Sequence, residues 1–496
     1  MPRHYIWRFL GCFVTCLFAG FGGSNQASAT PPPSQYGVPI PPHILERLRD
    51  LGTTRGYINL TRSVRANQAA IKSGVAGAAL APGGSQISGQ RFIPVLMGKF
   101  SNTTNDPFPV GDLQRQLFDG PWPTGTMIDY YKEISYGHLN IEGTVFPWKK
   151  LPSSDAHYAG AALPNGNACN GLCTNAKLGE FLKDMLDRYV DEVDFTKYDN
   201  DGPDGVPNSG DDDGFVDFVA FVHPEVGGEC GRNDNIWSHR STFSNWTGSP
   251  YETKSVGKNG QKIRVDDYVI MPAKACGGTT MIQIGVFAHE FGHAFGLPDL
   301  YDTQNFNGNS EGVGNWDLMG AGSWGGDNSH PETPSHMSAW SKEFLGWVTP
   351  REINADTDIV LRPVESQPDV VKVRISDSEY YLIEYRQKTG FDASLTGAGL
   401  AIWRINESVL SAGMINNTVN GDERSKGVGI VEADGLSQLD DQVNRGNAGD
   451  VFPFLPKRNF DSTTDPASVG RIAVCEIGDP GQTIKFKVRV SRNTCN

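Results

Sequence analysis

The chain has 496 residues, of which 43 are Lys or Arg and 57 are Asp or Glu, so its formal net charge at pH 7 is −14. A surface with this excess of negative charge repels nucleic acids and anionic membranes, which argues against both as partners. Beyond the first 29 residues, no segment approaches the ~20 consecutive apolar residues of a membrane-spanning helix. We therefore expect a globular protein of two or three domains without stable membrane association.

The first 29 residues have the layout of a secretory signal peptide. Two arginines precede an apolar stretch from Phe9 to Phe21, and Ala27-Ser28-Ala29 is a small-residue cleavage pattern. We expect cleavage after Ala29 and export of the protein to the extracellular space. Loss of the two arginines changes the formal charge from −14 to −16. Lipid attachment at Cys12 is an alternative, but it would leave almost no apolar region before the modified cysteine.

Six of the eight cysteines remain after removal of the signal peptide. An even number of cysteines in an exported chain predicts three disulfides. A cysteine zinc site is the alternative, but the one closely spaced pair lies in a Gly/Asn-rich loop with no second pair nearby. Proximity in sequence favours the pairings Cys169 with Cys173, Cys230 with Cys276, and Cys475 with Cys495.

Residues 30–90 differ in composition from the rest of the chain. They begin with a Pro-rich stretch, become weakly helical from His43 to Leu51, and end in a segment rich in Ala, Gly and Ser. Such a segment is expected to be either a removable pro-segment, which keeps a protease inactive until export, or a flexible linker.

A catalytic domain is predicted over residues 91–349. The apolar run Phe92–Met97 predicts a buried strand, and strand-like character returns from Phe215 to Val222. Between them, apolar residues recur at helical spacing from Lys177 to Val190, which predicts an amphipathic helix packed on a core. Because strands and helices mix along this region, we expect an α/β or α+β fold.

The pattern changes over residues 350–496 to short strand-like segments separated by turn residues, with no long helical period. This favours a β-rich C-terminal domain, either a sandwich or a sheet packed on the catalytic core. The expected strands are Ile359–Leu361, Val370–Ile375, Tyr380–Tyr385, Gly399–Ile405, Gly427–Val431 and Thr483–Val490.

A His-Glu-x-x-His motif lies at residues 289–293. Residues four apart share one face of a helix, so His289 and His293 can bind one zinc ion with Glu290 beside it. Gly296 can end the helix and let Asp299 turn back as the third ligand, which leaves the fourth position for water. The alternative is a pair of core histidines next to a solvated carboxylate.

Glu311 is an alternative third ligand, because it lies 18 positions after His293 and would imitate thermolysin. Its neighbours are turn residues, whereas thermolysin uses a glutamate on a second helix, so Asp299 is preferred. Met319 lies in a tight apolar turn after the zinc motif. That arrangement resembles the Met-turn beneath the zinc of metzincins.

These residues predict a zinc endopeptidase that acts on protein or peptide substrates. Zinc lowers the pKa of its bound water towards ~7, and Glu290 would take the proton of that water and pass it to the leaving amine. Two alternatives stay open. The chain could be a secreted binding protein with an inactive zinc site, or a zinc hydrolase that acts on a non-protein amide.

Carboxylates and glycines alternate on both sides of a Pro/Gly/Asn-rich insert between residues 199 and 217. Oxygen ligands that converge in this way bind calcium, as in EF-hand-type loops, although a solvated acidic turn is the alternative. The candidate calcium ligands are Asp199, Asp201, Asp213 and Asp217.

From Arg91 onward the chain resembles the immune inhibitor A family of secreted bacterial metallopeptidases. The resemblance implies a metzincin-like zinc endopeptidase with bound calcium, exported as a precursor. It also implies that His289 and His293 are zinc ligands, that Glu290 is the base and that Asp299 occupies the third-ligand position. The long insert in the calcium loop departs from the family pattern. The resemblance rests, in chain order, on Asp129–Gly137, Tyr198–Gly202, Ile236–Arg240, the zinc motif, Gly314–Met319 and Glu384–Gln387.

Overall fold

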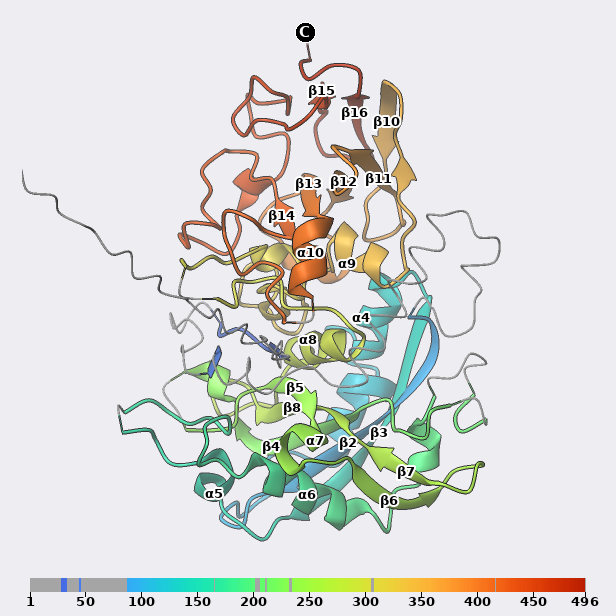
Figure 1. Ribbon diagram of the computed structural model, residues 1–496, viewed down its shortest axis with the longest axis vertical. Helices are drawn as coiled ribbons and strands as arrows, with labels where there is room; N and C mark the ends of the chain where they lie inside the picture. The colour runs from blue at the N-terminus through green and yellow to red at the C-terminus, as the bar shows by residue number, and fades with distance from the viewer. Residues whose placement is uncertain are drawn as a thin grey trace, which may run out of the picture.

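The computed structural model describes residues 28–33, 44–45, 87–164, 166–200, 206–209, 212–231, 234–304, 307–414 and 416–495. Figure 1 shows a large sheet with helices in the lower half, shorter strands in the upper half, and helix α8 (Ile284–Ala294) between them. Within these described ranges, no helix is both long enough and apolar enough to cross a membrane. Nearly all of the expected signal peptide and most of the segment 30–90 lie outside the described residues, so both remain predictions.

The lower half contains a six-stranded mixed sheet in the order β1-β5-β8-β4-β2-β3. The strands β2, β3, β4 and β8 are parallel to one another, β5 is antiparallel to β8, and β1 pairs antiparallel with β5 at the edge. The mixture of parallel strands and helices confirms the α/β character expected for this region. The strands are β1 (Ser28–Ala29), β2 (Gly89–Lys99), β3 (Leu139–Lys150), β4 (Val219–Val226), β5 (His239–Thr242) and β8 (Asp267–Lys274).

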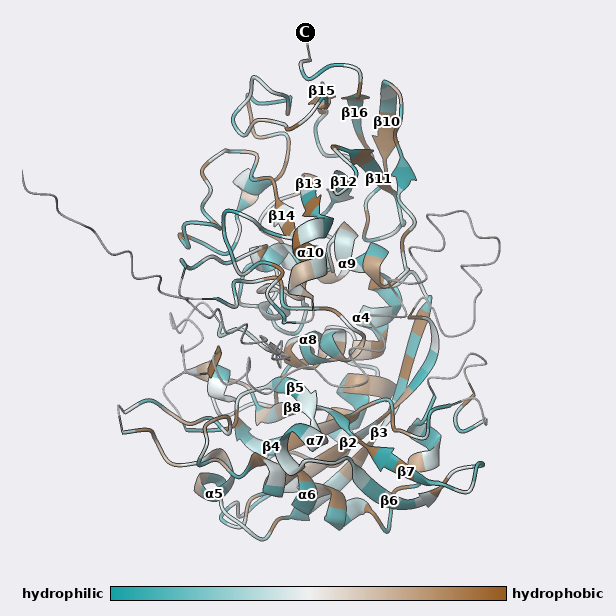
Figure 2. Cartoon of the chain, viewed as in Figure 1, coloured by the Kyte–Doolittle hydropathy of each residue, from teal (hydrophilic) through white to brown (hydrophobic). Residues whose placement is uncertain are grey.

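The central strands are buried on both faces of this sheet. Val95 and Met97 of β2 face a core that they share with α4 (Met127–Ile134) and α8, whereas Leu96 faces a second core formed with α6 (Leu178–Tyr189). Alternate side chains of a strand point to opposite faces, so a strand covered on both sides is apolar throughout. Figure 2 shows this as hydrophobic colouring along the central strands and more hydrophilic colouring on the outer elements β6 and β7.

The helix predicted over Lys177–Val190 is confirmed as α6, and its apolar residues at helical spacing are buried. The strand predicted from Phe215 begins four residues later, as β4 at Val219. Phe215 forms a single bridge with Arg264 outside the sheet, and the N–H of Asp217 donates to the carbonyl of Tyr198. The backbone here is paired with residues outside the six-stranded sheet, so β4 joins that sheet only from Val219 onward.

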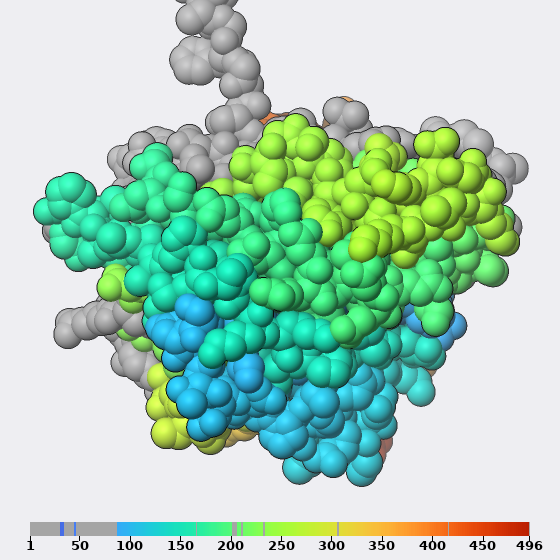
Figure 3. Space-filling view, turned by 90° about the horizontal axis from the view of Figure 1, so that it is seen from below, coloured from blue at the N-terminus to red at the C-terminus, as the bar shows by residue number. Residues whose placement is uncertain are grey.

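Shorter elements complete the lower half. Seen from the end opposite the C-terminal strands, this part of the chain forms the surface in Figure 3. The elements are α3 (Val110–Gln114), the π-helix η3 (Arg115–Asp119), α5 (Asp155–Ala159), α7 (Phe243–Thr247) and the paired strands β6 (Tyr251–Val256) and β7 (Lys262–Val265). Helix α9 (Ala339–Phe344) lies in the upper half, against strands of the C-terminal region (Figure 1).

The C-terminal region is β-rich, as expected, with a five-stranded sheet ordered β14-β13-β12-β11-β9 and a three-stranded sheet ordered β10-β16-β15. All six expected strands are present within one or two residues of their predicted ends. The strands β9 (Arg351–Glu352) and β15 (Ala473–Cys475) and the helix α10 (Glu407–Gly413) were not predicted. The remaining strands are β10 (Thr357–Leu361), β11 (Val370–Arg374), β12 (Glu379–Arg386), β13 (Gly399–Asn406), β14 (Val428–Ile430) and β16 (Ile484–Arg489).

The five-stranded sheet buries both of its faces. Leu382 and Trp403 belong to the core that also contains α4 and α8, whereas Ile383 and Ile402 belong to a core shared with the three-stranded sheet. Of the two arrangements that the sequence left open, a sandwich and a sheet packed on the catalytic core, the structure contains both. One hydrophobic core contains residues from both sides of residue 350, so the predicted domain boundary at that residue remains a prediction.

A buried ionic junction fixes the C-terminal sheet beneath the candidate site. The guanidinium of Arg386, on β12, donates to Asp392 at 2.6 and 2.8 Å and to the carbonyl of Trp316 at 2.9 Å. It also lies 3.3 Å from Glu384, and all of these side chains are buried. The segments Gly314–Met319 and Glu384–Gln387, quoted above for the resemblance, therefore meet in space.

Three disulfides are present, and they are the three pairings that proximity in sequence favoured. Cys169 pairs with Cys173, Cys230 with Cys276, and Cys475 with Cys495. The last of these ties β15 to the C-terminal segment, close to the end of the described chain.

Candidate metal and catalytic site

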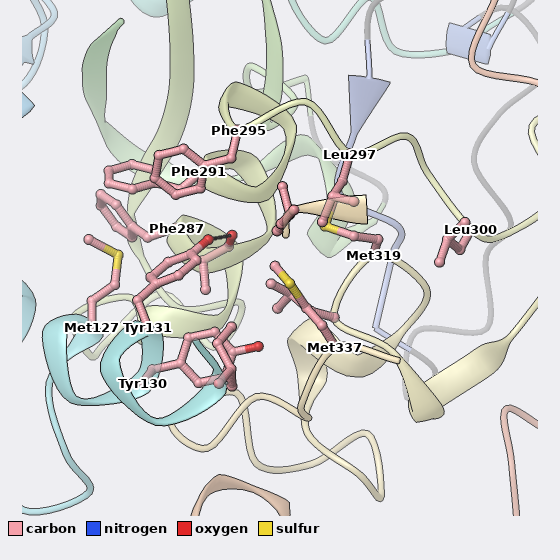
Figure 4. Close-up of a cluster of buried hydrophobic side chains, with 14 of the residues drawn as sticks. Met127, Tyr130, Tyr131, Phe287, Phe291, Phe295, Leu297, Leu300, Met319 and Met337 are labelled. Atoms are coloured by element: carbon pink, nitrogen blue, oxygen red, sulfur yellow. Dashed lines mark hydrogen bonds between the residues drawn. The ribbon is translucent and has the colours of Figure 1, made fainter. Parts of the chain in front are cut away.

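The His-Glu-x-x-His motif lies on α8, which is buried around almost its whole circumference. The helix ends at Ala294, Phe295 is its C-cap, and Gly296 follows with φ of +105°, a conformation that favours glycine. The chain can therefore turn back towards the helix within a few residues. Figure 4 shows phenylalanine side chains of α8 close to Tyr131 of α4. The hydroxyl of Tyr131 donates a hydrogen bond to the carbonyl of Ala288 at 2.6 Å.

His289, His293 and Asp299 place three ligand atoms close together. The Nε2 atoms of the two histidines are 3.1 Å apart, and Oδ1 of Asp299 lies 3.2 Å from Nε2 of His289 and 3.1 Å from Nε2 of His293. For Zn–N distances of ~2.0–2.1 Å, tetrahedral geometry requires ligand atoms about 3.3 to 3.4 Å apart. The nearly equilateral triangle of two nitrogens and one oxygen therefore fits zinc, with one position open.

Backbone carbonyls orient both imidazoles. Nδ1 of His289 donates to the carbonyl of Leu318 at 2.9 Å, and Nδ1 of His293 donates to the carbonyl of Leu297 at 2.8 Å. A neutral imidazole that donates from Nδ1 presents the lone pair of Nε2 to a metal. Burial lowers the pKa of His293. Burial also lowers the pKa of His289, but the hydrogen bond to Asp299 and the negative charges of Glu290 and Asp299 together outweigh it, and the pKa rises.

Asp299 is held by Asn417, a residue of the C-terminal region that the sequence did not single out. The amide nitrogen of Asn417 donates to Oδ2 of Asp299 at 2.6 Å, and its amide oxygen accepts the N–H of Asp299 at 2.7 Å. Burial would raise the pKa of Asp299, but the two neighbouring imidazoles outweigh it and hold the pKa far below its usual range. The carboxylate is thus kept ionised, with Oδ1 directed to the histidines.

Glu290 is fully buried next to the triangle. Its Oε1 accepts the N–H of Thr30 at 2.9 Å and the hydroxyl of Thr30 at 2.5 Å. Burial raises the pKa of Glu290 to about 8, mainly because the charged carboxylate loses its hydration. Only the ionised form of this carboxyl group can accept a proton, and a pKa close to neutral pH suits a group that both accepts and returns one.

Met319 lies under the motif helix. An added Cβ on Gly292 would lie 2.5 Å from the sulfur of Met319, so the glycine between the two histidines permits this close approach. The turn is fixed by Asp317, which accepts the N–H groups of Met319 and Ser338, each at 2.7 Å. Glu311, the alternative third ligand, instead forms a 2.8 Å ion pair with Arg445.

The candidate calcium residues are only partly described. Asp199 is buried, Asp213 accepts the N–H of Phe215, and Asp217 accepts the N–H of Asn200. Asp201 lies outside the described residues. In the described part of this loop, no group of three carboxylates has its oxygens within 4.8 Å of one another, so the calcium site remains a prediction.

A second group of buried carboxylates occurs in the C-terminal region. Ligand atoms of Glu432, Asp434 and Asp450 lie within 4.8 Å of one another. Oδ2 of Asp450 accepts the indole N–H of Trp316 at 2.8 Å. Burial raises the pKa of Glu432 to about 7 and that of Asp450 to about 6. No periodic pattern or motif in the sequence predicts this group.

Comparison with known proteins places the motif helix inside a recognised region. Residues 114–348 match the family described as immune inhibitor A peptidase M6, catalytic domain. Immune inhibitor A of Bacillus thuringiensis subsp. alesti is 32% identical over 245 residues, which are 47% of this chain and 34% of that protein. Pre-pro-metalloprotease PrtV of Vibrio cholerae serotype O1 (strain M66-2) is 30% identical over 257 residues, which are 50% of this chain and 26% of that protein. The match thus spans about a third or less of these relatives.

Proposed function

We propose that this chain is a secreted zinc endopeptidase that hydrolyses peptide bonds in proteins. The match of residues 114–348 to the immune inhibitor A peptidase M6 catalytic domain supports this proposal. In this proposal His289, His293 and Asp299 hold one zinc ion, and Glu290 is the general base. The observation that carries the proposal is the triangle of ligand atoms, 3.1 to 3.2 Å apart, beside a buried carboxylate that already faces a peptide N–H.

When bound, zinc would polarise the scissile carbonyl and lower the pKa of a water molecule. The chain's own residues supply the rest of the chemistry. Glu290 accepts the proton of the attacking water, and its contact with the N–H of Thr30 indicates that the same oxygen can reach a leaving nitrogen. Asn417 and the carbonyls of Leu297 and Leu318 keep the ligands in place.

The organisation proposed around this site follows the sequence. Residues 1–29 are the signal peptide, 30–90 a pro-segment, 91–349 a metzincin-like catalytic domain with Met319 beneath the zinc, and 350–496 the β-rich C-terminal domain. We also propose a structural calcium ion at Asp199, Asp201, Asp213 and Asp217, which is supported by the spacing of these carboxylates between glycine turns.

The test is Glu290→Gln, compared with Glu142→Gln on the exposed side of β3. We expect the Glu290 variant to retain stoichiometric zinc but to lose casein hydrolysis roughly 10²- to 10⁴-fold, because only proton transfer is removed. The control should keep both properties. In the native chain, a zinc chelator should abolish hydrolysis and added zinc should restore it. The same metal analysis would detect calcium.

The rival functions give different results in this assay. A binding protein with an inactive site would contain zinc but would not cleave casein. A hydrolase of non-protein amides would release acetate from acetyl-lysine peptides and leave casein intact. Full proteolysis by the Glu290→Gln variant would contradict the proposed mechanism.

A further inference from the structure

A short segment of the chain itself, residues 28–33, crosses the candidate site. Figure 1 shows this segment in dark blue next to α8. Its first part is β1, which extends the six-stranded sheet: Ser28 pairs with Arg240, and Ala29 pairs with His239, on the edge strand β5. An extended peptide that adds to a sheet edge in this way is a recurring mode of peptide recognition. The segment therefore marks the path that a peptide takes through the site.

The position of Thr30 identifies the peptide bond that faces the catalytic residues. Its N–H donates to Oε1 of Glu290, so in the full chain the nitrogen of the Ala29–Thr30 bond lies where a general base would deliver a proton. After the expected cleavage behind Ala29, the same nitrogen is the terminal amine and corresponds to the amine of a released product. On hydrolysis of such a bond, water supplies OH to the carbonyl carbon and its two protons are shared between the new carboxyl group and the leaving amine. Thr30 thus stands for the first residue after the cleaved bond.

Three side chains bind the carbonyls of this segment in succession. The indole N–H of Trp237 donates to the carbonyl of Thr30 at 3.0 Å, and that of Trp324 donates to the carbonyl of Pro31 at 2.8 Å. Nη1 of Arg445 donates to the carbonyl of Pro32 at 2.5 Å. We call Trp237, Trp324 and Arg445 the carbonyl ladder. Its members come from the approach to β5, from the turn after Met319, and from the C-terminal region.

The carbonyl ladder is built to bind main chain. An indole N–H and a guanidinium can donate but cannot accept a hydrogen bond, so each selects a carbonyl rather than an N–H. The two tryptophans are only 2% and 4% exposed, so their N–H groups depend on the bound segment for a partner. Glu311 holds the guanidinium of Arg445 at 2.8 Å and fixes its direction.

The segment also indicates a sequence preference. Positions 31 and 32 are proline, which has no N–H to donate. The described contacts of these two residues with the carbonyl ladder use only their carbonyls, so a proline ring removes nothing that the ladder binds. Many peptide grooves pair with both groups of an extended chain and lose a hydrogen bond at proline.

We propose that Trp237, Trp324 and Arg445 are positioning residues that bind three successive carbonyls on the leaving-group side of the scissile bond, so that the enzyme accepts substrates with proline at the second and third positions after that bond. This inference rests on the proposed function. In the full chain, residues 30–33 occupy the same positions and compete with substrate.

The test compares two quenched peptides in the full chain. Both contain Ala-Thr-Pro, and the longer one continues with a second proline and further residues, whereas the shorter one ends before the third carbonyl. The background is Thr30→Glu, which sets a carboxylate against buried Glu290 and should expel the chain's own segment. Arg445→Gln should raise KM about tenfold for the longer peptide, the loss typical of a charge-assisted hydrogen bond, with kcat little changed. KM for the shorter peptide should stay within about twofold.

Matched controls separate positioning from a general structural effect. Arg471→Gln removes an exposed guanidinium elsewhere in the C-terminal region and should leave both KM values unchanged. Trp324→Phe should raise KM for both peptides, because each contains the second carbonyl. Equal effects of Arg445→Gln on the two peptides, or no effect on either, would overturn the inference. If neither peptide is cleaved, the proposed function fails. The role of the carbonyl ladder is then decided by peptide binding, measured by tryptophan fluorescence, in which Arg445→Gln should weaken binding of the longer peptide only.

Discussion

The side chain that fixes Asp299, the proposed third zinc ligand, comes from 118 positions further along the chain. Asn417 contacts both the carboxylate and the N–H of Asp299, so it sets the direction of Oδ1 towards the histidines. Residues that orient a metal ligand typically affect metal affinity 10- to 100-fold. Asn417 has φ of +52°, a conformation in which asparagine and glycine are favoured over other residues.

We therefore expect Asn417→Gly to weaken zinc binding about 10- to 100-fold without straining the backbone, as measured by competition with a chromogenic chelator. Asn328→Gly is the matched control, because Asn328 also has positive φ, 62°, but is half-buried and lies outside the metal site. Unchanged zinc affinity in the Asn417 variant would show that the histidines and the chain turn alone position Asp299.

The buried carboxylates of the C-terminal region should make stability depend on pH. Burial raises the pKa of Glu432 from 4.5 to about 7 and that of Asp450 from 3.8 to about 6. The folded state therefore retains these protons at pH values where the unfolded state has lost them. Their contribution to stability is greatest below about pH 4 and is lost as the pH rises through 6 to 7.

Glu432→Gln removes one of these titrations while it keeps the side-chain volume. We expect the melting temperature of this variant to fall less steeply than that of the native chain between pH 5 and 7.5. Calorimetry at constant ionic strength measures the slope. Identical slopes for the two proteins would mean that Glu432 does not hold its proton in the folded state.

At the scale of elements, the helices and strands with a periodic apolar pattern could be predicted from the sequence, whereas the shortest ones could not. Helix α6 and the six C-terminal strands have clear apolar patterns, and each lies where it was expected. Helix α10 has only seven residues, too few for a helical period, although Asn406 caps its first turn. Strand β15 has only three residues, too few to show an alternating pattern; it pairs with β16, and a disulfide joins its Cys475 to Cys495.

A glycine on helix α8, Gly285, allows the backbone of another segment to pack directly against the helix. An added Cβ on Gly285 would lie 1.9 Å from the carbonyl oxygen of Ser323 and 2.8 Å from that of Pro331. Both are backbone atoms, which cannot move aside as a flexible side chain does. The helix is therefore seated against the segment that follows Met319 by direct backbone contact.

Gly285→Ala should destabilise the protein by about 1–3 kcal/mol, the usual cost of overpacking, and should also lower zinc occupancy because α8 must shift. Denaturant unfolding and metal analysis measure the two effects. Gly277→Ala is the control, since an added Cβ there meets nothing within 4 Å. Equal stability of the two variants would indicate that the backbone after Met319 can move to make room for the added methyl group.

At the scale of the whole molecule, the zinc site could be predicted only where it is local in sequence. The two histidines, Glu290 and Asp299 fall within 11 residues, and helical spacing brings them together. Asn417 and Arg445 reach the same site from the C-terminal region, and no pattern in a single sequence reports such a contact. The family match also ends at residue 348, before either of them.

The shared core predicts that the catalytic and C-terminal regions unfold together. Removing the guanidinium of Arg386 leaves Asp392 and Glu384 buried without their partner. Breaking a buried ion pair from one side typically costs about 3–5 kcal/mol. We expect Arg386→Met to lower stability by that order in one calorimetric transition, whereas Arg374→Met, at an exposed pair, should have little effect. Two separate transitions would show that the regions are energetically independent.

Because Asn417 and Arg445 contact Asp299 and Pro32 from beyond the matched region, the C-terminal region contributes to both the proposed metal site and the proposed peptide path. If the proposed function holds, exchanging this region between related enzymes would alter metal retention and the choice of cleavage sites together, without any change to the motif helix.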